Sequence, residues 1–313
     1  MSDLSYFHPR QVASYLGLSK GYMFAMLHSL GIEGIRISKC KRVLSSADVR
    51  KLMLHRNFNY DSKIFNFHGL KGGTGKTTLA FSLAKTAVNF GYRALLVDLD
   101  TQSNLTGLFL NNIDEWKSLA DVIHDDLKFS SCFLTVAENL DLFPSNLNNS
   151  MLDFLLEKNK INLSTYLRKE LFALKDEYDI IVIDCPPSLS ETTVLATCAA
   201  DLTIIPINPD EFSINGMRLT IDELKRTEKD FDLDLDFRVV INKYDGRKNT
   251  SLACIGNITN DYSLFSKTTK TIIRTSSVFE KSQSYKSNIF TARKSSAQED
   301  AVAFARELLN IGE

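Results

Sequence analysis

An octapeptide in the first third of the chain contains the residue types that bind phosphate. It reads Lys71-Gly72-Gly73-Thr74-Gly75-Lys76-Thr77-Thr78 and stands between an apolar run at 64–67 and a helical apolar pattern. Glycines let successive backbone N–H groups converge on phosphate oxygens, and the start of a helix adds partial positive charge. The sequence therefore predicts a nucleotide site, with Lys76 on the β- and γ-phosphates and the Thr77 hydroxyl on Mg²⁺.

Three carboxylates at the ends of apolar runs provide the acidic groups that such a site needs. Asp98 and Asp100 close the run that starts at 94, and Asp184 ends the run that starts at 180. A buried carboxylate is costly without a partner, and Mg²⁺ takes oxygen ligands. Asp98 and Asp100 are two residues apart, so on an extended strand both point the same way. We predict that Asp184 and Asp98 join Thr77 as metal ligands.

The octapeptide resembles the deviant Walker A motif of the ParA/MinD family of partition and positioning ATPases. The first glycine of an ordinary Walker A motif would fall at Leu70, and a second lysine, Lys71, opens the loop instead.

Two later segments strengthen this resemblance. Residues 97–104 are similar to the family's D-x-D-P-Q-G-N, with Thr101 and Ser103 in place of its proline and glycine. Residues 180–188 are similar to its Walker B strand and the following D-x-P-P, and the likeness spans about residues 64–310.

The resemblance implies an ATPase that binds ATP and Mg²⁺ and forms a homodimer around the nucleotide. It implies that Lys71 reaches the partner's nucleotide and that Asp100 positions the attacking water, so Lys71, Lys76 and Asp100 are the expected catalytic residues. Further nucleotide contacts are implied at Pro206 and Asn242. The implied partners are DNA and a centromere-binding ParB-type protein, both stimulating a weak turnover. Non-specific DNA binding by the body is expected at Lys270, Arg274 and Lys281.

The choice of nucleotide has two interpretations. Asn242-Lys243-Tyr244-Asp245 spells N-K-x-D, the guanine-reading motif of many GTPases, directly after an apolar run. The family resemblance implies ATP, with a similar asparagine at this place. We favour ATP because the octapeptide and the D-x-D segment are longer and have the right context.

Charge divides the chain into a basic head and an acidic body. Residues 1–60 contain nine Lys/Arg and three Asp/Glu, whereas the whole chain has 37 and 38, for a net charge of −1. A small basic segment on an acidic body is typical of a segment that meets a polyanion.

The head has the pattern of a winged helix-turn-helix and resembles MerR-like and excisionase-like DNA-binding domains. Pro9 opens one amphipathic helix, Ser19 is a natural N-cap for a second, and a basic hairpin follows at 35–44. Ser45 and Asp48 form a capping-box pattern before a third helix. We expect base contacts from Ser19, Lys20 and Tyr22, and phosphate contacts from Lys39, Lys41 and Arg42. Dimerisation is expected to sharpen operator binding, through which the head would regulate its own operon.

These patterns predict an α/β fold: a mostly parallel P-loop NTPase sheet preceded by a small winged helix-turn-helix domain. The expected boundaries are 1–54 for the head, 55–63 for a linker and 64–313 for the ATPase domain. No signal peptide or membrane span is visible, so a cytoplasmic, nucleoid-associated protein is expected.

Three rival functions remain at this stage. A MinD-like positioning ATPase would need a basic amphipathic C-terminal helix, and the helical pattern from 299 is acidic and expected to pack on the core. An iron–sulfur reductase subunit would need two suitably placed cysteines. A transcriptional regulator would use the nucleotide only as a ligand.

Overall fold

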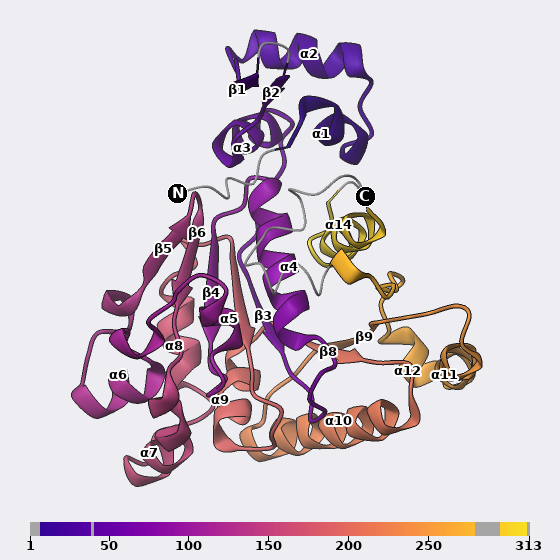
Figure 1. The fold of residues 1–313 in the computed structure, drawn as a ribbon. Helices are drawn as coiled ribbons and strands as arrows, with labels where there is room; N and C mark the ends of the chain where they lie inside the picture. The colour runs from indigo at the N-terminus through magenta and orange to yellow at the C-terminus, as the bar shows by residue number, and fades with distance from the viewer. Residues whose placement is uncertain (1–6, 39–40, 279–294, 312–313) are drawn as a thin grey trace.

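The computed structural model describes residues 7–38, 41–278 and 295–311 (Figure 1). A seven-stranded sheet forms its centre, in the order β5-β6-β4-β7-β3-β8-β9. The strands are β3 (Lys63–Phe67), β4 (Ala94–Asp98), β5 (Leu134–Ala137), β6 (Leu140–Phe143), β7 (Ile180–Asp184), β8 (Leu202–Ile207) and β9 (Phe237–Ile241). Only β5 runs antiparallel to its neighbour. The carboxyl ends of the six parallel strands therefore meet at one edge, where α/β proteins bind ligands.

Helices cover both faces of the sheet, as the continuous apolar runs of its strands require. The helices of the body are α4 (Lys76–Asn89), α5 (Asn104–Gly107), α6 (Leu119–Asp125), α7 (Leu152–Lys158), α8 (Tyr166–Phe172), α9 (Glu191–Ala199), α10 (Glu211–Phe231), α11 (Asn249–Asn260), α12 (Tyr262–Ser266) and α14 (Ser296–Leu308). Among the described residues, short 3-10 helices lie at Ile113–Glu115, Phe129–Cys132 and Leu147–Met151. Helices α4 and α14 share a core with one face, and α6 to α9 share a core with the other. Helix α10 shares a third apolar core with β8 and β9.

The C-terminal helix α14 packs against α4, as its acidic amphipathic pattern predicts. Its residues Ala301, Phe304 and Ala305 are at most 1% exposed, and the Phe304 ring meets Phe67 edge to face. In the part of the chain that the structure describes, no helix is long and apolar enough to cross a bilayer.

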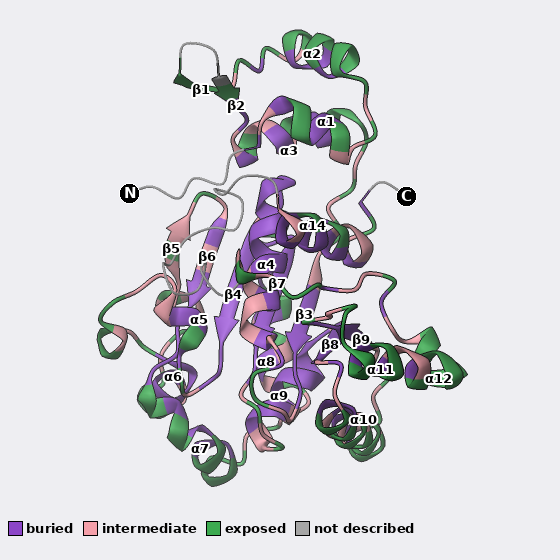
Figure 2. Ribbon diagram, turned by 45° about the vertical axis from the view of Figure 1, so that its right-hand side comes forward, coloured by how far each residue is buried: buried purple, intermediate pink, exposed green. Residues whose placement is uncertain are grey.

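The head contains α1 (Pro9–Tyr15), α2 (Lys20–Ser29), the hairpin β1 (Ile35–Ser38) and β2 (Lys41–Val43), and α3 (Ser46–His55). Its helices begin where the sequence predicts. The Ser19 hydroxyl accepts the N–H of Tyr22 at 3.2 Å, and Ser45 and Asp48 form a reciprocal capping box. Helix α2 lies on the side of the head that is farthest from the body, and its outer face is exposed (Figure 2).

The head is docked on the C-terminal end of α4, and the two parts share one apolar core. The Ser46 hydroxyl donates to the carbonyl of Val88 at 2.6 Å, and Arg50 donates to that of Gly91 at 2.8 Å. The guanidinium groups of Arg50 and Arg93 both bind the carboxylate of Asp179, which is 3% exposed. This carboxylate joins the head to the body, because its buried charge would be left unpaired if both arginines were lost.

Residues 56–62, between α3 and β3, have no regular secondary structure but are not a free tether. Phe58, Tyr60 and Tyr92 pack edge to face, and the Tyr60 hydroxyl donates to the carbonyl of Phe90 at 2.8 Å. The guanidinium of Arg50 lies 4.1 Å from the centre of the Tyr60 ring. The segment that the sequence predicts as a polar linker is thus part of the junction.

We expect Gly91→Ala to loosen this junction. Gly91 has φ +87°, and an added Cβ would lie 2.6 Å from the backbone nitrogen of Arg50 and 2.7 Å from the Tyr60 hydroxyl oxygen. The conformational cost alone is about 1–3 kcal/mol, and the clash adds to it. Gly17→Ala is the matched control, because Gly17 has φ +64° in the head with nothing within 4 Å of its Cβ position. Hydrogen exchange should increase at α3 and β4 in Gly91→Ala only; equal protection in both variants would contradict the assigned junction.

Candidate nucleotide site

The octapeptide forms the loop between β3 and α4, at the carboxyl edge of the sheet (Figure 1). Gly73 and Gly75 have φ +74° and +96°, a backbone conformation that residues other than glycine rarely adopt. Gly75 is the N-cap of α4. The loop lines a cavity of about 640 Å³ together with Asp100 and Pro187. The glycine loop and the N-terminus of α4 thus border a space that is large enough for the phosphates of a nucleotide.

Lys76 is buried inside this loop. Its Nζ donates to the carbonyls of Gly69 and Lys71, at 3.1 and 3.3 Å, and the residue is 6% exposed. Burial lowers its pKa, and the carboxylates of Asp184 and Asp100 oppose that shift. A lysine in this place is positioned to exchange loop carbonyls for phosphate oxygens.

Asp184 fits the predicted role of metal ligand. It ends β7, in register with Phe67 of β3 and Asp98 of β4, and is fully buried. Its carboxylate oxygens are buried without a well-formed hydrogen bond in the described chain, although the Thr77 hydroxyl interacts with them. Burial raises its pKa well above the usual range, and the neighbouring Asp98 adds to the rise. A buried carboxylate beside the Thr77 hydroxyl, with no well-formed hydrogen bond of its own, is the kind of oxygen donor that Mg²⁺ takes.

Asp98, which the sequence predicts as a metal ligand, is hydrogen-bonded to its own loop. Its two oxygens accept the N–H of Asp100 at 3.0 Å and the N–H and hydroxyl of Thr106 at 2.8 and 2.7 Å. Burial raises its pKa to about 7 against the effect of these bonds. Three hydrogen bonds from the chain tie Asp98 to the loop after β4, and its role as a metal ligand stays a prediction.

Asp100 lies where the sequence predicts, facing the phosphate cavity. It is 6% exposed, and its Oδ1 accepts the N–H of Gln102 at 3.0 Å. Its carbonyl accepts the Ser145 hydroxyl at 2.7 Å, which fixes the turn that carries the carboxylate. The side chain is therefore held rigidly at the wall that faces the glycine loop.

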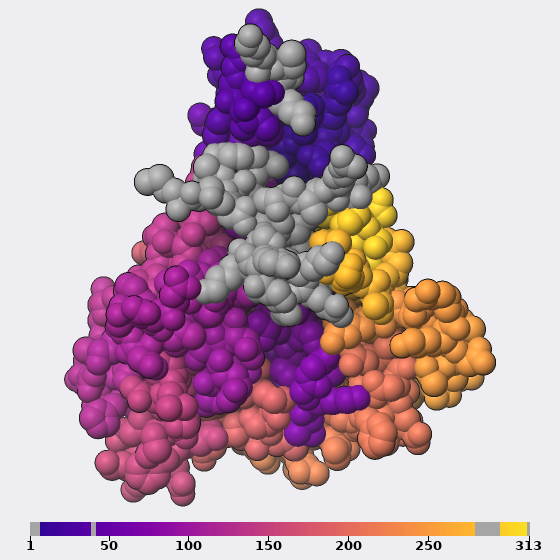
Figure 3. Space-filling model, in the orientation of Figure 1, coloured from indigo at the N-terminus to yellow at the C-terminus, as the bar shows by residue number. Residues whose placement is uncertain are grey.

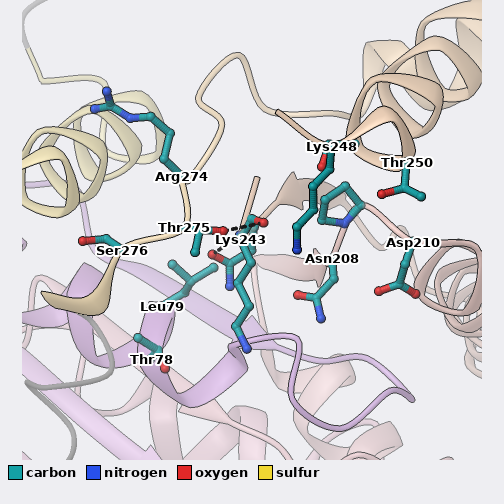
Figure 4. A pocket seen from close by; sticks show the side chains of 13 residues that line it. Thr78, Leu79, Asn208, Asp210, Lys243, Lys248, Thr250, Arg274, Thr275 and Ser276 are labelled. Atoms are coloured by element: carbon teal, nitrogen blue, oxygen red, sulfur yellow. Dashed lines mark hydrogen bonds between the residues drawn. The ribbon is translucent and has the colours of Figure 1, made fainter. Parts of the chain in front are cut away.

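A second cavity, of about 380 Å³, opens beside the first (Figure 4). It is lined by Thr78, Leu79, Asn208, Pro209, Asp210, Asn242, Lys243, Lys248, Thr250, Ser251, Arg274, Thr275 and Ser276. The Oδ1 of Asn208 and the hydroxyl of Ser251 are buried there without a partner in the described chain. Only Leu79 and Pro209 of these residues are apolar, so the cavity mainly offers hydrogen-bonding groups to a ligand that lies beside the glycine loop.

Pro206, an expected nucleotide contact, is the residue before the end of β8. Pro206 lies inside β8, in register with Val240 of β9, and does not line the cavity. Asn208 and Pro209 do, because β8 continues to Ile207 before the chain turns. The sequence did not predict that the strand extends to Ile207, because a proline interrupts the apolar run one residue earlier.

Asn242 and its neighbour clamp the glycine loop. The side-chain amide of Asn242 donates to the carbonyl of Thr74 at 2.7 Å, and Lys243 Nζ donates to that of Gly73 at 2.8 Å. A Cβ on Gly75 would lie 2.2 Å from the Asn242 amide nitrogen, so glycine is required there. Sequence reasoning missed Lys243, although its place in the N-K-x-D tetrapeptide was a signal.

The carboxylate of Asp245, the last residue of that tetrapeptide, is paired with a nearby arginine. Asp245 makes a two-pronged ion pair with Arg247, at 2.8 and 2.9 Å, and this pairing lowers its pKa to about 2. It does not line the cavity. Guanine recognition needs a free carboxylate at this position, so the geometry disfavours that interpretation.

Lys71 points away from the phosphate cavity. Its Nζ lies 2.7 Å from Oδ1 of Asp210, the N-cap of α10, and 5.8 Å from the centre of the Phe212 ring. The side chain is about one-third exposed. It is the lysine at the open rim of the loop, whereas Lys76 is the lysine inside it.

The residues expected to bind DNA fall into two groups. On the head, Ser19, Lys20, Tyr22 and Arg42 are exposed, and Tyr22 is 57% exposed. On the body, Lys270 is exposed, but Arg274 binds Asp300 at 2.7 Å and Glu299 at 3.3 Å and so ties its loop to α14. Lys39 and Lys281 lie outside the described residues, as does the side chain of Lys41.

The sequence is similar to a known domain family and to known bacterial proteins. The AAA domain family matches residues 62–237. The sporulation initiation inhibitor protein Soj of Bacillus subtilis is 32% identical over 199 residues, covering 63% of this chain and 78% of Soj. The chromosome-partitioning ATPase Soj of Treponema pallidum is 31% identical over 202 residues, with the same two coverages.

A solved structure shares the fold. An aspartate-to-alanine variant of McdA from Cyanothece, in complex with ATP, superposes with a TM-score of 0.71 at 21% identity, over 80% of this chain and 98% of that one. Fold and site together define a P-loop NTPase with a second lysine at the start of its loop. The chain belongs to the ParA/MinD family of ATPases.

Proposed function

We propose that this protein is a DNA partition ATPase that binds ATP with Mg²⁺, dimerises on ATP and hydrolyses it weakly. The observation that carries the proposal is the pair of lysines: Lys76 is buried among the loop carbonyls, and Lys71 stands at the rim. In the proposed dimer, Lys71 would leave Asp210 to reach the nucleotide of the second copy, where it would stabilise transition-state charge as an arginine finger does.

The metal and the water have their own residues in this proposal. Asp184 and Thr77 would hold Mg²⁺, which neutralises charge that develops on the phosphates. Asp100, fixed at the cavity wall, would orient the attacking water. Measuring phosphate release with ATP, with and without DNA and a centromere-binding ParB-type protein, tests the activity. No release under any of these conditions would contradict it and favour a regulator that only binds nucleotide.

We further propose that the head is a winged helix-turn-helix that binds an operator and regulates its own operon. Support comes from the exposed start of α2, the neighbouring hairpin and the local positive charge. The body would bind DNA of any sequence in the ATP state, which would place the protein on the nucleoid.

We expect the site to prefer ATP to GTP, and Asp245→Ala to leave that preference unchanged. The Asp245 carboxylate is already paired with Arg247, so its removal should change ATP affinity by less than about twofold. Asn242→Ala is the contrasting variant, because it removes the clamp on Thr74 and should weaken both nucleotides about tenfold. Competition titrations with fluorescent nucleotides measure both. A gain or loss of GTP binding in Asp245→Ala would show that the tetrapeptide reads the base.

A further inference from the structure

The head and the nucleotide site lie at opposite ends of the molecule. The phosphate loop follows β3 at the carboxyl edge of the sheet, whereas the head contacts Gly91 and Asp179, which precede β4 and β7 at the amino edge. Helix α4 connects the two, and its 14 residues span about 21 Å. Figure 3 shows the head as a lobe at one pole of the molecule.

The head cannot swing toward the nucleotide site without breaking buried contacts. Its core is continuous with that of α4, Asp179 binds arginines from both parts, and Gly91 leaves no space between them. Lys20 and Tyr22 are exposed, and α2, which carries them, lies on the outer side of this docked lobe (Figure 2).

In the proposed dimer, the two copies meet at the carboxyl edge of the sheet, at the pole opposite the head. Lys71 is at the carboxyl edge, and exposed apolar side chains accompany it there: Phe212 at the start of α10 is 81% exposed, and Leu189 after β7 is 47% exposed. Two copies that meet through this edge have their α4 helices pointing outward. Two lengths of α4 already amount to about 40 Å, and each head extends the particle further.

We infer that the ATP dimer is a bridge between two DNA duplexes, one bound by each head. The two α2 helices face outward from opposite poles, so one straight duplex cannot contact both. Adjacent half-sites lie about 34 Å apart on one face of the DNA, and folding a short duplex around the whole particle would be costly. This geometry departs from the expectation that dimerisation sharpens the reading of one operator. The inference rests on the proposed ATP dimer and on DNA binding by the head.

A two-duplex capture experiment tests the bridge. The full-length protein is added to a biotinylated 40-base-pair duplex on beads, taken from the DNA upstream of its own gene, with excess unlabelled random DNA to occupy the body. A fluorescent duplex of the same sequence as the first is then added. With ATP and Mg²⁺ the beads should retain the fluorescent duplex, and with ADP they should not. The double variant Lys20→Ala/Tyr22→Ala should retain at least about tenfold less. Lys51→Ala, an exposed lysine on α3 of the same head, is the matched control and should bridge like the wild type.

Two accompanying measurements separate the possible failures. Light scattering gives the mass of the ATP complex, and fluorescence anisotropy gives binding of a single duplex. Dimers whose heads bind one duplex but retain no second one would overturn the bridge and leave the proposed function standing. Equal capture by the double variant would overturn it too, because the body would then be the bridging surface. A missing dimer, or heads that bind no DNA, would overturn the proposed function and the bridge together.

Discussion

Replacing Lys76 by alanine is expected to abolish ATP turnover and ATP-dependent dimerisation. The ammonium group is buried 3.1 Å from the carbonyl of Gly69, in the loop that would surround the phosphates. Losing a charge-assisted contact to phosphate costs about 1.5–3 kcal/mol in binding, and losing its stabilisation of the transition state lowers turnover about 100- to 1,000-fold. Isothermal titration with ATP and a phosphate-release assay measure the two effects.

The control for Lys76→Ala is Lys128→Ala, an exposed lysine remote from the loop. It should match the wild type in both assays. Thermal unfolding of the Lys76 variant should remain cooperative, which excludes loss of the fold as the cause. ATP binding and turnover at wild-type levels in Lys76→Ala would mean that the glycine loop is not the phosphate site.

Replacing Asp100 by alanine is expected to separate ATP binding from ATP hydrolysis. The carboxylate faces the phosphate cavity but forms no part of the glycine loop, so ATP should still bind and the dimer should accumulate. Turnover should fall about 100- to 10,000-fold, the range for losing a group that orients or deprotonates the nucleophile. Single-turnover hydrolysis measures this fall, and light scattering measures the dimer.

Asp114→Ala is the matched control for Asp100→Ala, because Asp114 lies in a turn near the cavity and no part of the site depends on its carboxylate. Unchanged hydrolysis in Asp100→Ala would reject the water-positioning role. Loss of ATP binding together with hydrolysis would assign Asp100 to the metal or the phosphates instead.

Local patterns predicted the elements that build the site. The apolar runs ending at Asp98 and Asp184 became β4 and β7 with those bounds, because buried parallel strands leave an unmistakable stretch of aliphatic residues. The caps at Ser19 and Ser45 also lie where the sequence places them, since a capping hydroxyl acts within its own turn.

Contacts between distant segments could not be predicted in the same way. Nothing near Asp98 in the sequence shows that Thr106 will occupy its carboxylate, and nothing near Arg274 points to Asp300. The docking of the head depends on Asp179, 129 residues beyond Arg50. Residue types and their spacing predict which helix, strand or turn carries a side chain. Only the tertiary fold decides whether another side chain has already paired with it.

Sedimentation velocity of the full-length protein with ATP, with ADP and without nucleotide tests the central claim most directly. The claim is that the site couples ATP, through Lys71 at the loop rim, to the joining of two copies. With ATP and Mg²⁺ we predict a species of twice the 35.3 kDa chain mass, more abundant in Asp100→Ala and absent in Lys76→Ala. A mass that is the same in all three nucleotide conditions would contradict the account.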